Sequence, residues 1–349
     1  KHVAGSFYLG QCFSALYSLE GLNNLSSVLG DVKILGNGKL NIFSGLESLD
    51  SIGGDMTVEG NSSLINFEGL NNLSNINGLF SVRYNDSILN FSGFDNLIST
   101  GGLEVVSNTS LINFEGLEGL SIINGNTVIG KGGYYFSNGN PALTTLNGLD
   151  NLSYINGSLS VEYNNVLDNL TGLIALDSIN GPIFITHNDT LSSLSGLDNI
   201  SAGSIGYLTI SQNDDLNNCA VQSICDYLTI PGAIVNINNN ADGCNDTTQV
   251  NEACLGVSIE DININNKAIL FPNPVIDFAN LSVEFHKGNF IGIFIYNISG
   301  ICMKSWQFQN NSNLRGEFEL DLSDIPAGIY FCQVKIGNEM VTKKIIKTK

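Results

Sequence analysis

The feature that most constrains this sequence is a repeat of about two dozen residues. The pair Gly-Leu, once Gly-Phe, recurs at the same place in each unit, with successive gaps of 24, 24, 24, 23, 32, 24 and 24 residues. A fixed period in this range is typical of solenoids, in which each unit forms one coil of a stack. The pairs begin at Gly21, Gly45, Gly69, Gly93, Gly116, Gly148, Gly172 and Gly196.

An asparagine also recurs once in each unit. Apolar residues lie five and three positions before it in nearly every unit, which predicts a short strand with alternate residues facing inward. Counting back about one period from the first asparagine reaches Cys12, which takes the same place, so about ten coils are expected. The asparagines are Asn37, Asn61, Asn85, Asn108, Asn140, Asn164, Asn188, Asn213 and Asn240.

Stacking explains why a polar residue would be fixed at one position. A single coil cannot bury its apolar residues, but a stack of coils shares one interior. An unpaired backbone group in that interior costs roughly 1–3 kcal/mol, and an asparagine can bond its own turn and the neighbouring coils. We therefore expect a buried asparagine ladder. The residues that follow it, such as Leu167, Leu170 and Leu173, recur every third position, which suits short strands and corners rather than helix.

The unit at 155–173 carries a family resemblance. It combines Ile-x-Gly-x-Leu-x-Val with an asparagine three residues later and then Gly-Leu. This pattern resembles both the leucine-rich repeat L-x-x-L-x-L-x-x-N/C-x-L and the β-helical repeat of the receptor L-domain. The resemblance covers residues 5–254 and implies a mainly β, leucine-rich or receptor L-like solenoid, with the receptor L-like form favoured. Such solenoids are general binding scaffolds, so no particular ligand is implied.

Four of the seven cysteines fall in the last repeats, over 213–254, where an open stack would expose its core. This segment is expected to form a small helical cap: 220–228 reads as an amphipathic helix, and Asp246 with Gln249 indicates the start of a second. Each helix carries a cysteine four residues after a valine, which favours joining those two cysteines among the three possible pairings. Disulfides imply an extracytoplasmic compartment. The favoured disulfides are Cys219–Cys244 and Cys225–Cys254.

The charge is distributed unevenly along the chain. Residues 1–254 hold five of the 14 Lys and Arg residues and 24 of the 33 Asp and Glu residues, whereas 255–349 hold nine of each. The acidic part disfavours nucleic acid and anionic lipid as partners. No apolar run reaches the roughly 18 residues of a membrane span. The chain opens at Lys1 without a basic, apolar leader, as expected of a mature form.

The charge boundary coincides with a change of pattern. Residues 255–268 are polar and rich in asparagine, which is typical of a linker. Seven short alternating segments then follow over 269–349 and predict an immunoglobulin-like β-sandwich. Cys302 and Cys332 fall in two of them, where a bridge is possible. The expected strands are Ile269–Phe271, Asn280–Phe285, Ile291–Asn297, Ile301–Gln309, Glu317–Leu322, Gly328–Ile336 and Met340–Lys347.

Segment 269–349 also carries four motifs in a characteristic order. They are FPNP at 271–274, IYNISG at 295–300, LDLSDIPAGIY at 320–330 and TKKIIK at 342–347. The segment thereby resembles the type A C-terminal sorting domain of the type IX secretion system of Bacteroidota. The resemblance implies export by the type IX machinery, removal of the domain within 255–268, and release or attachment at the cell surface. The sorting positions are Pro272, Asn273, Pro274, Gly328, Tyr330, Lys343 and Lys344.

A candidate binding surface follows from the predicted sheet. Positions four, two and one before each asparagine lie outside the inward-facing pair, so they are expected on the exposed face. Their aromatic and imidazole side chains predict a stripe for a glycan or a protein. The unit after Gly116 is longer, with extra residues around Asn126 to Asn138, and a binding loop and a tolerated surface loop are both consistent with it. The candidate binding residues are Tyr84, Phe136, Tyr163, Phe184 and His187.

Catalysis is the alternative, because β-helical enzymes often cleave polysaccharides. Lyases need Lys or Arg at the site, and only Lys33 and Arg83 lie near the predicted face. Hydrolysis needs two carboxylates roughly 5–10 Å apart, yet the acids are thinly spread over the repeats and the three histidines lie far apart. The sequence therefore favours a secreted or cell-surface binding or adhesion protein over a polysaccharide-degrading enzyme. We expect a monomer without catalytic residues, cofactor or metal.

Overall fold

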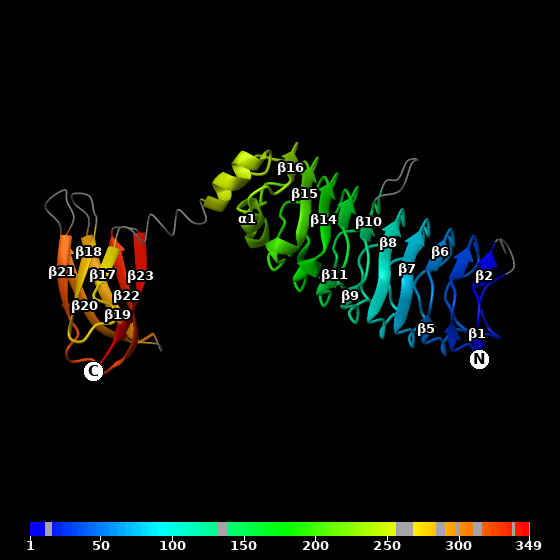
Figure 1. Cartoon of the computed structure of the whole chain (residues 1–349), viewed down its shortest axis with the longest axis horizontal. Helices are drawn as coiled ribbons and strands as arrows, with labels where there is room; N and C mark the ends of the chain where they lie inside the picture. The colour runs from blue at the N-terminus through cyan, green and yellow to red at the C-terminus, as the bar shows by residue number, and fades with distance from the viewer. Residues whose placement is uncertain are drawn as a thin grey trace. The chain divides into compact units, whose positions relative to one another are not determined.

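The computed structural model describes residues 1–10, 16–130, 139–255, 268–283, 290–297, 300–309, 316–336 and 339–348. The chain forms two compact units, Lys1–Cys254 and Leu255–Lys349, both drawn in Figure 1. Each unit has its own hydrophobic core, and each is described by itself.

The N-terminal unit is a β-solenoid of about nine turns with parallel pairing between neighbouring coils (Figure 1). We number the coils 1 to 9 by the asparagines from Asn37 to Asn240. Each coil contributes a long strand, and most coils add a short one before it; β7 (Asn75–Arg83) and β8 (Ser99–Val106) run through both places. The short strands are β1 (His2–Val3), β3 (Ser27–Val28), β5 (Ser51–Ile52), β9 (Ile122–Ile123), β11 (Tyr154–Ile155) and β13 (Ser178–Ile179). The other long strands are β2 (Phe7–Gly10), β4 (Val32–Leu35), β6 (Met56–Glu59), β10 (Thr127–Ile129), β12 (Leu159–Glu162), β14 (Gly181–Thr186), β15 (Ile205–Ser211) and β16 (Val235–Asn238).

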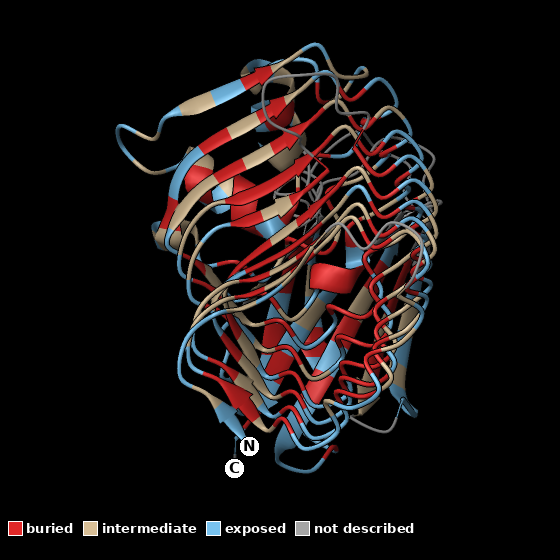
Figure 2. Cartoon of the chain, turned by 90° about the vertical axis from the view of Figure 1, so that its right-hand side faces the viewer, coloured by how far each residue is buried: buried red, intermediate tan, exposed pale blue. Residues whose placement is uncertain are grey.

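Alternation along the long strands separates the inside of the solenoid from the outside. In β4, Val32 and Ile34 are buried, whereas Lys33 between them is half-buried. Val32 lies opposite Met56 of the next coil, so residues of one kind form columns along the stack. Figure 2 shows the buried positions recurring from coil to coil. A period-two pattern therefore fixes which face of the sheet meets the core.

The recurring asparagines form a buried ladder beside this core. Asn85 Nδ2 donates to the carbonyl of Val58 in the preceding coil (2.9 Å) and to that of Arg83 in its own coil (3.0 Å). Its Oδ1 accepts the backbone N–H of Asn61 (2.9 Å). All nine asparagines take part, and all except Asn240 are fully buried. Backbone groups that face the interior thereby find partners.

A second column of side-chain acceptors precedes the long strands. Asp31 Oδ1 accepts the backbone N–H of Asp55 (3.1 Å), and Asp55 Oδ1 accepts that of Leu79 (2.8 Å). In coil 5, Asn126 Oδ1 does the same for Ser158 (2.9 Å). These residues were not expected to carry a structural role, because Asp, Leu, Asn and Ser all occur at this place and leave no uniform pattern. Cys12, expected in the asparagine column, lies outside the described residues.

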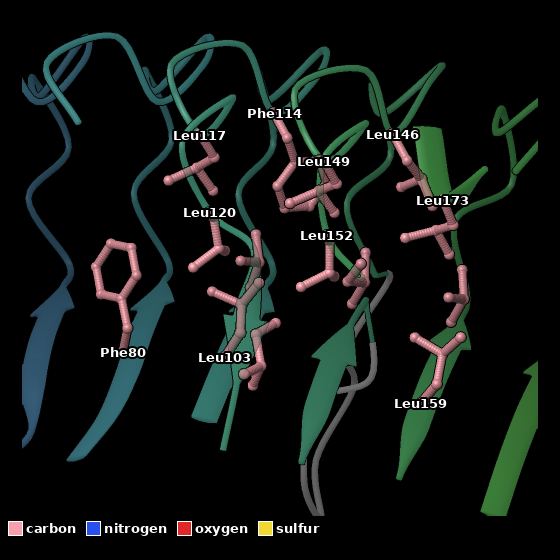
Figure 3. Close-up of a cluster of buried hydrophobic side chains, with 14 of the residues drawn as sticks. Phe80, Leu103, Phe114, Leu117, Leu120, Leu146, Leu149, Leu152, Leu159 and Leu173 are labelled. Atoms are coloured by element: carbon pink, nitrogen blue, oxygen red, sulfur yellow. The ribbon is translucent and has the colours of Figure 1, made fainter. Parts of the chain in front are cut away.

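Aromatic rings stack through the interior of coils 1 to 4. The ring centroids of Phe43, Phe67, Phe91 and Phe114 follow one another at 5.6, 5.3 and 5.2 Å, with planes within 8° of parallel. Leucine, isoleucine and valine make up most of the rest of the core, and Figure 3 shows leucines around Phe114. Six residues after the ladder asparagine, where coils 1 to 4 have these phenylalanines, coils 5 to 8 have Leu146, Leu170, Leu194 and Cys219, and Cys219 is 1% exposed. Stacked aromatic pairs of this kind add about 0.5–1.5 kcal/mol each beyond the area that they bury.

The Gly-Leu pairs mark a close approach between coils. Gly69 has a φ of +105°, and a Cβ built on it would lie 2.3 Å from the carbonyl oxygen of Phe43. No L side chain fits there without moving the backbone. The leucine that follows, Leu70, is fully buried. The period seen in the sequence is therefore that of a steric requirement repeated in coils 1 to 7.

Two helices form the cap: one lies between coils 8 and 9 in the chain, and the other follows coil 9. The helix α1 (Gln222–Leu228) begins two residues later than expected, because Val221 keeps an extended backbone and is its N-cap residue. A second helix covers residues 247–255. Its start carries the side-chain cap that the sequence indicates: Asp246 Oδ1 accepts the backbone N–H of Gln249 (2.9 Å). Gln249 Oε1 in turn accepts the N–H of Asn245 (3.0 Å).

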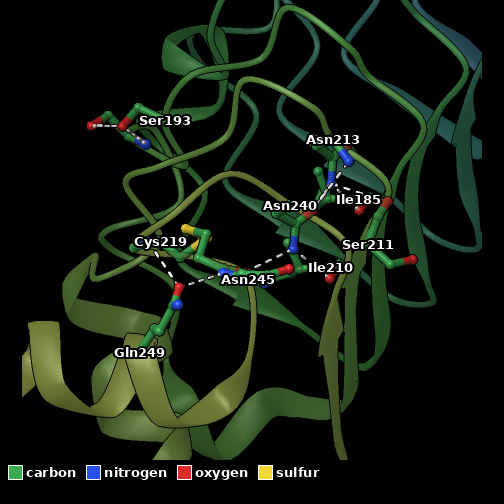
Figure 4. Close-up of a disulfide and its surroundings, with 12 residues drawn as sticks. Ile185, Ser193, Ile210, Ser211, Asn213, Cys219, Asn240, Asn245 and Gln249 are labelled. Carbon is green, nitrogen blue, oxygen red and sulfur yellow. Dashed lines mark hydrogen bonds between the residues drawn. A yellow bond between two sulfur atoms is a disulfide. The ribbon is translucent and has the colours of Figure 1, made fainter.

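The cap is fastened by two disulfides, Cys219–Cys244 and Cys225–Cys254, which are the two pairs that the spacing favours. Figure 4 shows Cys219 close to the last asparagines of the ladder. Cys219 and Cys244 are buried in the solenoid core. The cap thereby covers the end of the core at coil 9.

The C-terminal unit consists of two antiparallel sheets that share one core. A three-stranded sheet has the order β17-β18-β21 and a four-stranded sheet the order β20-β19-β22-β23. Both sheets contribute to the core, for example Leu281 from the first and Ile293 from the second. The strands lie within two residues of their expected bounds. They are β17 (Ala268–Phe271), β18 (Phe278–Val283), β19 (Phe290–Asn297), β20 (Cys302–Gln309), β21 (Gly316–Asp321), β22 (Gly328–Ile336) and β23 (Glu339–Lys347).

The two cysteines of this unit are not joined. Cys302 is an exposed free thiol, and Cys332 is a buried one. Burial raises the pKa of Cys332 to about 12, so this thiol stays protonated and packs as a small apolar residue. The bridge that the sequence left open does not form here.

Candidate functional site

One face of the long-strand sheet points away from the core. The pairing register places one residue of each coil in a continuous row, which we call the outer row. Val128 takes the place of coil 5, opposite Glu104 and Ser160. The sequence pattern, counted back from Asn140, assigned this place to Phe136. That assignment is wrong, because the extra residues of coil 5 follow strand β10 and Val128 holds the place. The outer row is Tyr8, Lys33, Thr57, Ser81, Glu104, Val128, Ser160, Phe184, Thr209 and Asn236.

Aromatic side chains of coils 6 to 8 gather on this face as two pairs. The rings of Tyr163 and His187 stack with centroids 4.2 Å apart and planes 12° from parallel. Phe184 meets Tyr207 edge to face, with centroids 5.2 Å apart. Tyr207 was missed by the sequence analysis because it lies six positions before Asn213, outside the positions considered. We call these four residues the aromatic patch.

The other candidate residues are not part of this patch. Tyr84 belongs to coil 3 and is 43% exposed. Phe136 lies outside the described residues. Three of the five predicted binding residues, Tyr163, Phe184 and His187, are therefore close together in neighbouring coils.

The position just before each ladder asparagine has an unusual backbone. Its φ is positive in all nine coils, between 54° and 67°. Glycine, which tolerates this region, occupies it in three coils as Gly36, Gly60 and Gly139. The other coils place a side chain there at a cost in strain. Those residues are Tyr84, Ser107, Tyr163, His187, Gln212 and Asn239.

Polar groups surround the aromatic patch. Ser160 donates its hydroxyl to the carboxylate of Glu162, and both side chains are buried, as is Thr186 opposite Glu162 in the next coil. His187 Nδ1 is buried, and no hydrogen-bond partner for it lies among the described residues. These hydroxyl and carboxylate groups are therefore buried, and the groups that the patch exposes are its rings, including the imidazole of His187.

The basic residues of the outer face are held by carboxylates. Lys33 Nζ lies 3.4 Å from Asp31. Arg83 lies between Glu59 (Nε to Oε2, 3.2 Å) and Glu104 (Nη1 to Oε2, 3.8 Å). Both cations thus have a carboxylate beside them. Within the described ranges, no group of three or more His, Cys, Asp or Glu side chains is placed to hold a metal ion.

In the C-terminal unit, the predicted sorting residues connect the start of the unit to its last strand. Asn273 Nδ2 donates to the carbonyl of Lys344 in β23 (2.7 Å), and its Oδ1 accepts the N–H of Ile346 (2.9 Å). Pro272 and Pro274 on either side are exposed. Asn273 therefore holds the FPNP segment against β23.

The remaining sorting residues divide into structural and exposed ones. Tyr330 is 5% exposed and donates its hydroxyl to the carbonyl of Pro326 (2.8 Å), which fixes the turn before β22. Gly328 starts that strand beside the Tyr330 ring. Lys344 is exposed, whereas partial burial lowers the pKa of Lys343. Lys344 is therefore the better placed of the two lysines to contact a partner.

Residues 269–348 match the family described as the secretion system C-terminal sorting domain. That is the domain that the four motifs resemble, and we refer to the C-terminal unit as the sorting domain from here on. A type IX sorting domain directs export through the secretion machinery, so the protein is secreted or lies on the outer-membrane surface. No curated protein matches the chain. Among the described residues, no helix has the length and hydrophobicity needed to cross a bilayer.

Proposed function

We propose that the exported protein is a binding or adhesion protein whose solenoid holds a glycan or a protein on the outer face of its long-strand sheet. The observation that carries this proposal is the aromatic patch, because half-exposed aromatic side chains concentrated on one face are typical of binding surfaces. The core positions are apolar in every coil, whereas the residues of the outer row differ from coil to coil. This variation supports the outer face as the part of the solenoid that recognises a ligand.

Two finer assignments belong to the same proposal. The Gly-Leu pair and the asparagine ladder support a receptor L-like or leucine-rich form of the solenoid. The two antiparallel sheets with a common core support an immunoglobulin-like sandwich for the sorting domain. The machinery that recognises the sorting domain is then one partner, and removal of this domain within 255–268 would leave the solenoid free.

Catalysis is the weaker candidate. A lyase needs an available Lys or Arg, and on this face Lys33 and Arg83 each lie beside a carboxylate. A polysaccharide hydrolase needs one carboxylic acid and one carboxylate across the scissile bond. Glu162 accepts a hydrogen bond from Ser160, and Glu59 and Glu104 lie beside Arg83. We therefore propose a protein without enzymatic activity.

The binding proposal is tested with the full chain on arrays of glycans and of cell-surface proteins. Specific binding that is lost when the aromatic patch is altered would support it, and a failure to bind any ligand would leave a purely structural role. Turnover of a polysaccharide panel tests the enzyme alternative: activity that disappears with Glu162→Gln would overturn our choice. Export is tested by deleting 269–349, which should keep the protein out of the medium and off the cell surface.

A further inference from the structure

We infer that the aromatic patch on coils 6 to 8 binds a neutral oligosaccharide, with sugar rings lying against the Tyr163–His187 and Phe184–Tyr207 pairs. This inference rests on the proposed binding function and names its ligand class and its place. Three observations carry it: a backbone conformation, a bulge, and the size and charge of the surface.

The first observation is the backbone at Tyr163 and His187. Their φ values are 60° and 56°, a region that bulky residues avoid. Gly36, Gly60 and Gly139 hold the same place in coils 1, 2 and 5, so the fold accepts glycine there. A ring gains no core burial at this place, since both rings stay half-exposed. Several coils carry this strain, but in coils 6 and 7 the two strained residues also stack as a ring pair at 4.2 Å, and the two features together point to a role in contacting a ligand.

The second observation is the irregular pairing that presents Tyr207. The register between β14 and β15 shifts after Gly181, so that Ile183 lies opposite Leu208 and one extra residue enters coil 8. Bulges of this kind re-aim side chains at functional positions. Here the extra residue falls in the segment that contains Tyr207, which is 36% exposed and meets the Phe184 ring. The second aromatic pair thus depends on a local departure from the repeat.

The third observation is the size of the surface. Coils stack at about 4.8 Å, and the strand from the level of Tyr207 to His187 spans five residue steps, or about 17 Å. The patch therefore covers roughly 10 Å by 17 Å, far below the roughly 800 Å² per partner of a stable protein interface. An oligosaccharide fits this scale, because the rings face its C–H groups and the phenol hydroxyls of Tyr163 and Tyr207 and the imidazole of His187 can bond its hydroxyls.

Charge selects between sugars. The solenoid has five bases against 24 acids, so its net charge is strongly negative. A uronate or sulfated polymer would be repelled by this field. A neutral chain of hexose, pentose or N-acetylhexosamine units meets no such barrier.

The test uses the full chain and titration calorimetry with a panel of neutral hexose, pentose and N-acetylhexosamine oligomers, with polygalacturonate oligomers as the acidic probe. The variant Tyr163→Gly/His187→Gly removes one pair while relieving the backbone. Its matched control is Tyr84→Gly, which makes the same change in coil 3. Phe184→Ser tests the second pair, because serine holds the same place in coils 3 and 6 as Ser81 and Ser160.

We expect at least one neutral probe to bind, a loss of about tenfold or more in affinity for each patch variant, and unchanged affinity for the control. Melting temperatures of the glycine variants should equal or exceed that of the unaltered chain, which separates lost binding from lost folding. Binding that the patch variants leave intact, or a preference for polygalacturonate, would overturn the inference while the binding function stands. Absence of binding to every sugar overturns it too, and the protein array then decides whether the binding function also fails.

Discussion

The solenoid and the sorting domain reach stability by different routes. In the solenoid, each coil repeats the same parallel pairing and the same side-chain ladder, so that one kind of contact recurs along the stack. In the sorting domain, antiparallel strands each contribute different side chains to a small core. A repeated contact makes the solenoid depend on a few residue types at fixed places, whereas the sorting domain depends on the match between its two sheets.

The contrast extends to charge and to covalent links. The solenoid part holds five bases against 24 acids and the rest of the chain nine of each. Both disulfides lie in the cap of the solenoid, and in the described part of the sorting domain Cys302 and Cys332 are free. The chain's single tryptophan, Trp306, packs against the sorting-domain core. Tryptophan fluorescence therefore reports the sorting domain alone, and amide hydrogen exchange can follow the solenoid.

Loss of one ladder asparagine should have the largest effect. Asn140→Ala leaves the buried N–H of Asn108 without its acceptor at 3.1 Å. It also removes the hydrogen bonds from Asn140 Nδ2 to the carbonyl of Val105 (2.9 Å), which keeps the N–H of Gly130 as a donor, and to Asn164 Oδ1 (3.2 Å). At roughly 1–3 kcal/mol for the unsatisfied N–H and about 1 kcal/mol for each of the other two bonds, the solenoid should lose about 3–5 kcal/mol of its free energy of unfolding. Hydrogen exchange in coils 4 to 6 measures this loss.

The control for this change is Asn165→Ala, in the exposed turn of coil 6, which should alter stability by less than about 0.5 kcal/mol. The Trp306 fluorescence transition should be the same in both variants. A comparable loss from Asn165→Ala would contradict the special role of the ladder position. A shifted Trp306 transition would contradict the independent unfolding of the two units.

Removal of a cap disulfide should have the next largest effect. Cys225 and Cys254 are 29 residues apart, and a cross-link over a loop of this length stabilises by about 3 kcal/mol. Cys225→Ala/Cys254→Ala should therefore lower the stability of coils 7 to 9 by this amount. Cys302→Ala, which removes an exposed free thiol, is the control. If the disulfide variant melts like the control, the cap does not secure the end of the solenoid.

The period, the asparagine column and the sorting motifs could be predicted because each repeats or follows a fixed order of residue types. The assignment of Phe136 to the outer row failed because the sequence does not show whether the extra residues of coil 5 precede or follow its strand. Tyr207 was missed because only the positions four, two and one before each asparagine were considered, and it lies six before Asn213. The positive φ before each asparagine could not be predicted from the sequence either, because Tyr, Ser, His, Gln and Asn occur at this position as well as glycine.

A smaller effect should come from relieving the strained backbone. Tyr84→Gly replaces a half-exposed side chain at a φ of 56° with the residue that coils 1, 2 and 5 use there. The strain removed is about 1–2 kcal/mol and the entropy that glycine adds to the unfolded chain costs about 1 kcal/mol, so the net change in stability should lie between zero and about +1 kcal/mol. Thr57→Gly, in an extended strand of the same face, should instead lose about 1 kcal/mol. Chemical denaturation of both variants distinguishes strain from a general effect of glycine.

The smallest effect is on stability at low pH. The melting temperature of the acidic solenoid should fall more steeply with decreasing pH than that of the neutral sorting domain. The hydrogen bond from the backbone N–H of Asp55 holds the pKa of Asp31 below its ordinary value, and Lys33 adds to this. The bond therefore stabilises the fold above the unfolded-state pKa of about 3.9 and is lost as the pH falls through the lowered pKa of the folded state. Asn126 shows that an amide oxygen fills the same place in coil 5. Asp31→Asn should thus keep the bond and flatten the fall in melting temperature below about pH 4, whereas an unchanged acid profile would mean that the charge of Asp31 contributes nothing to the column.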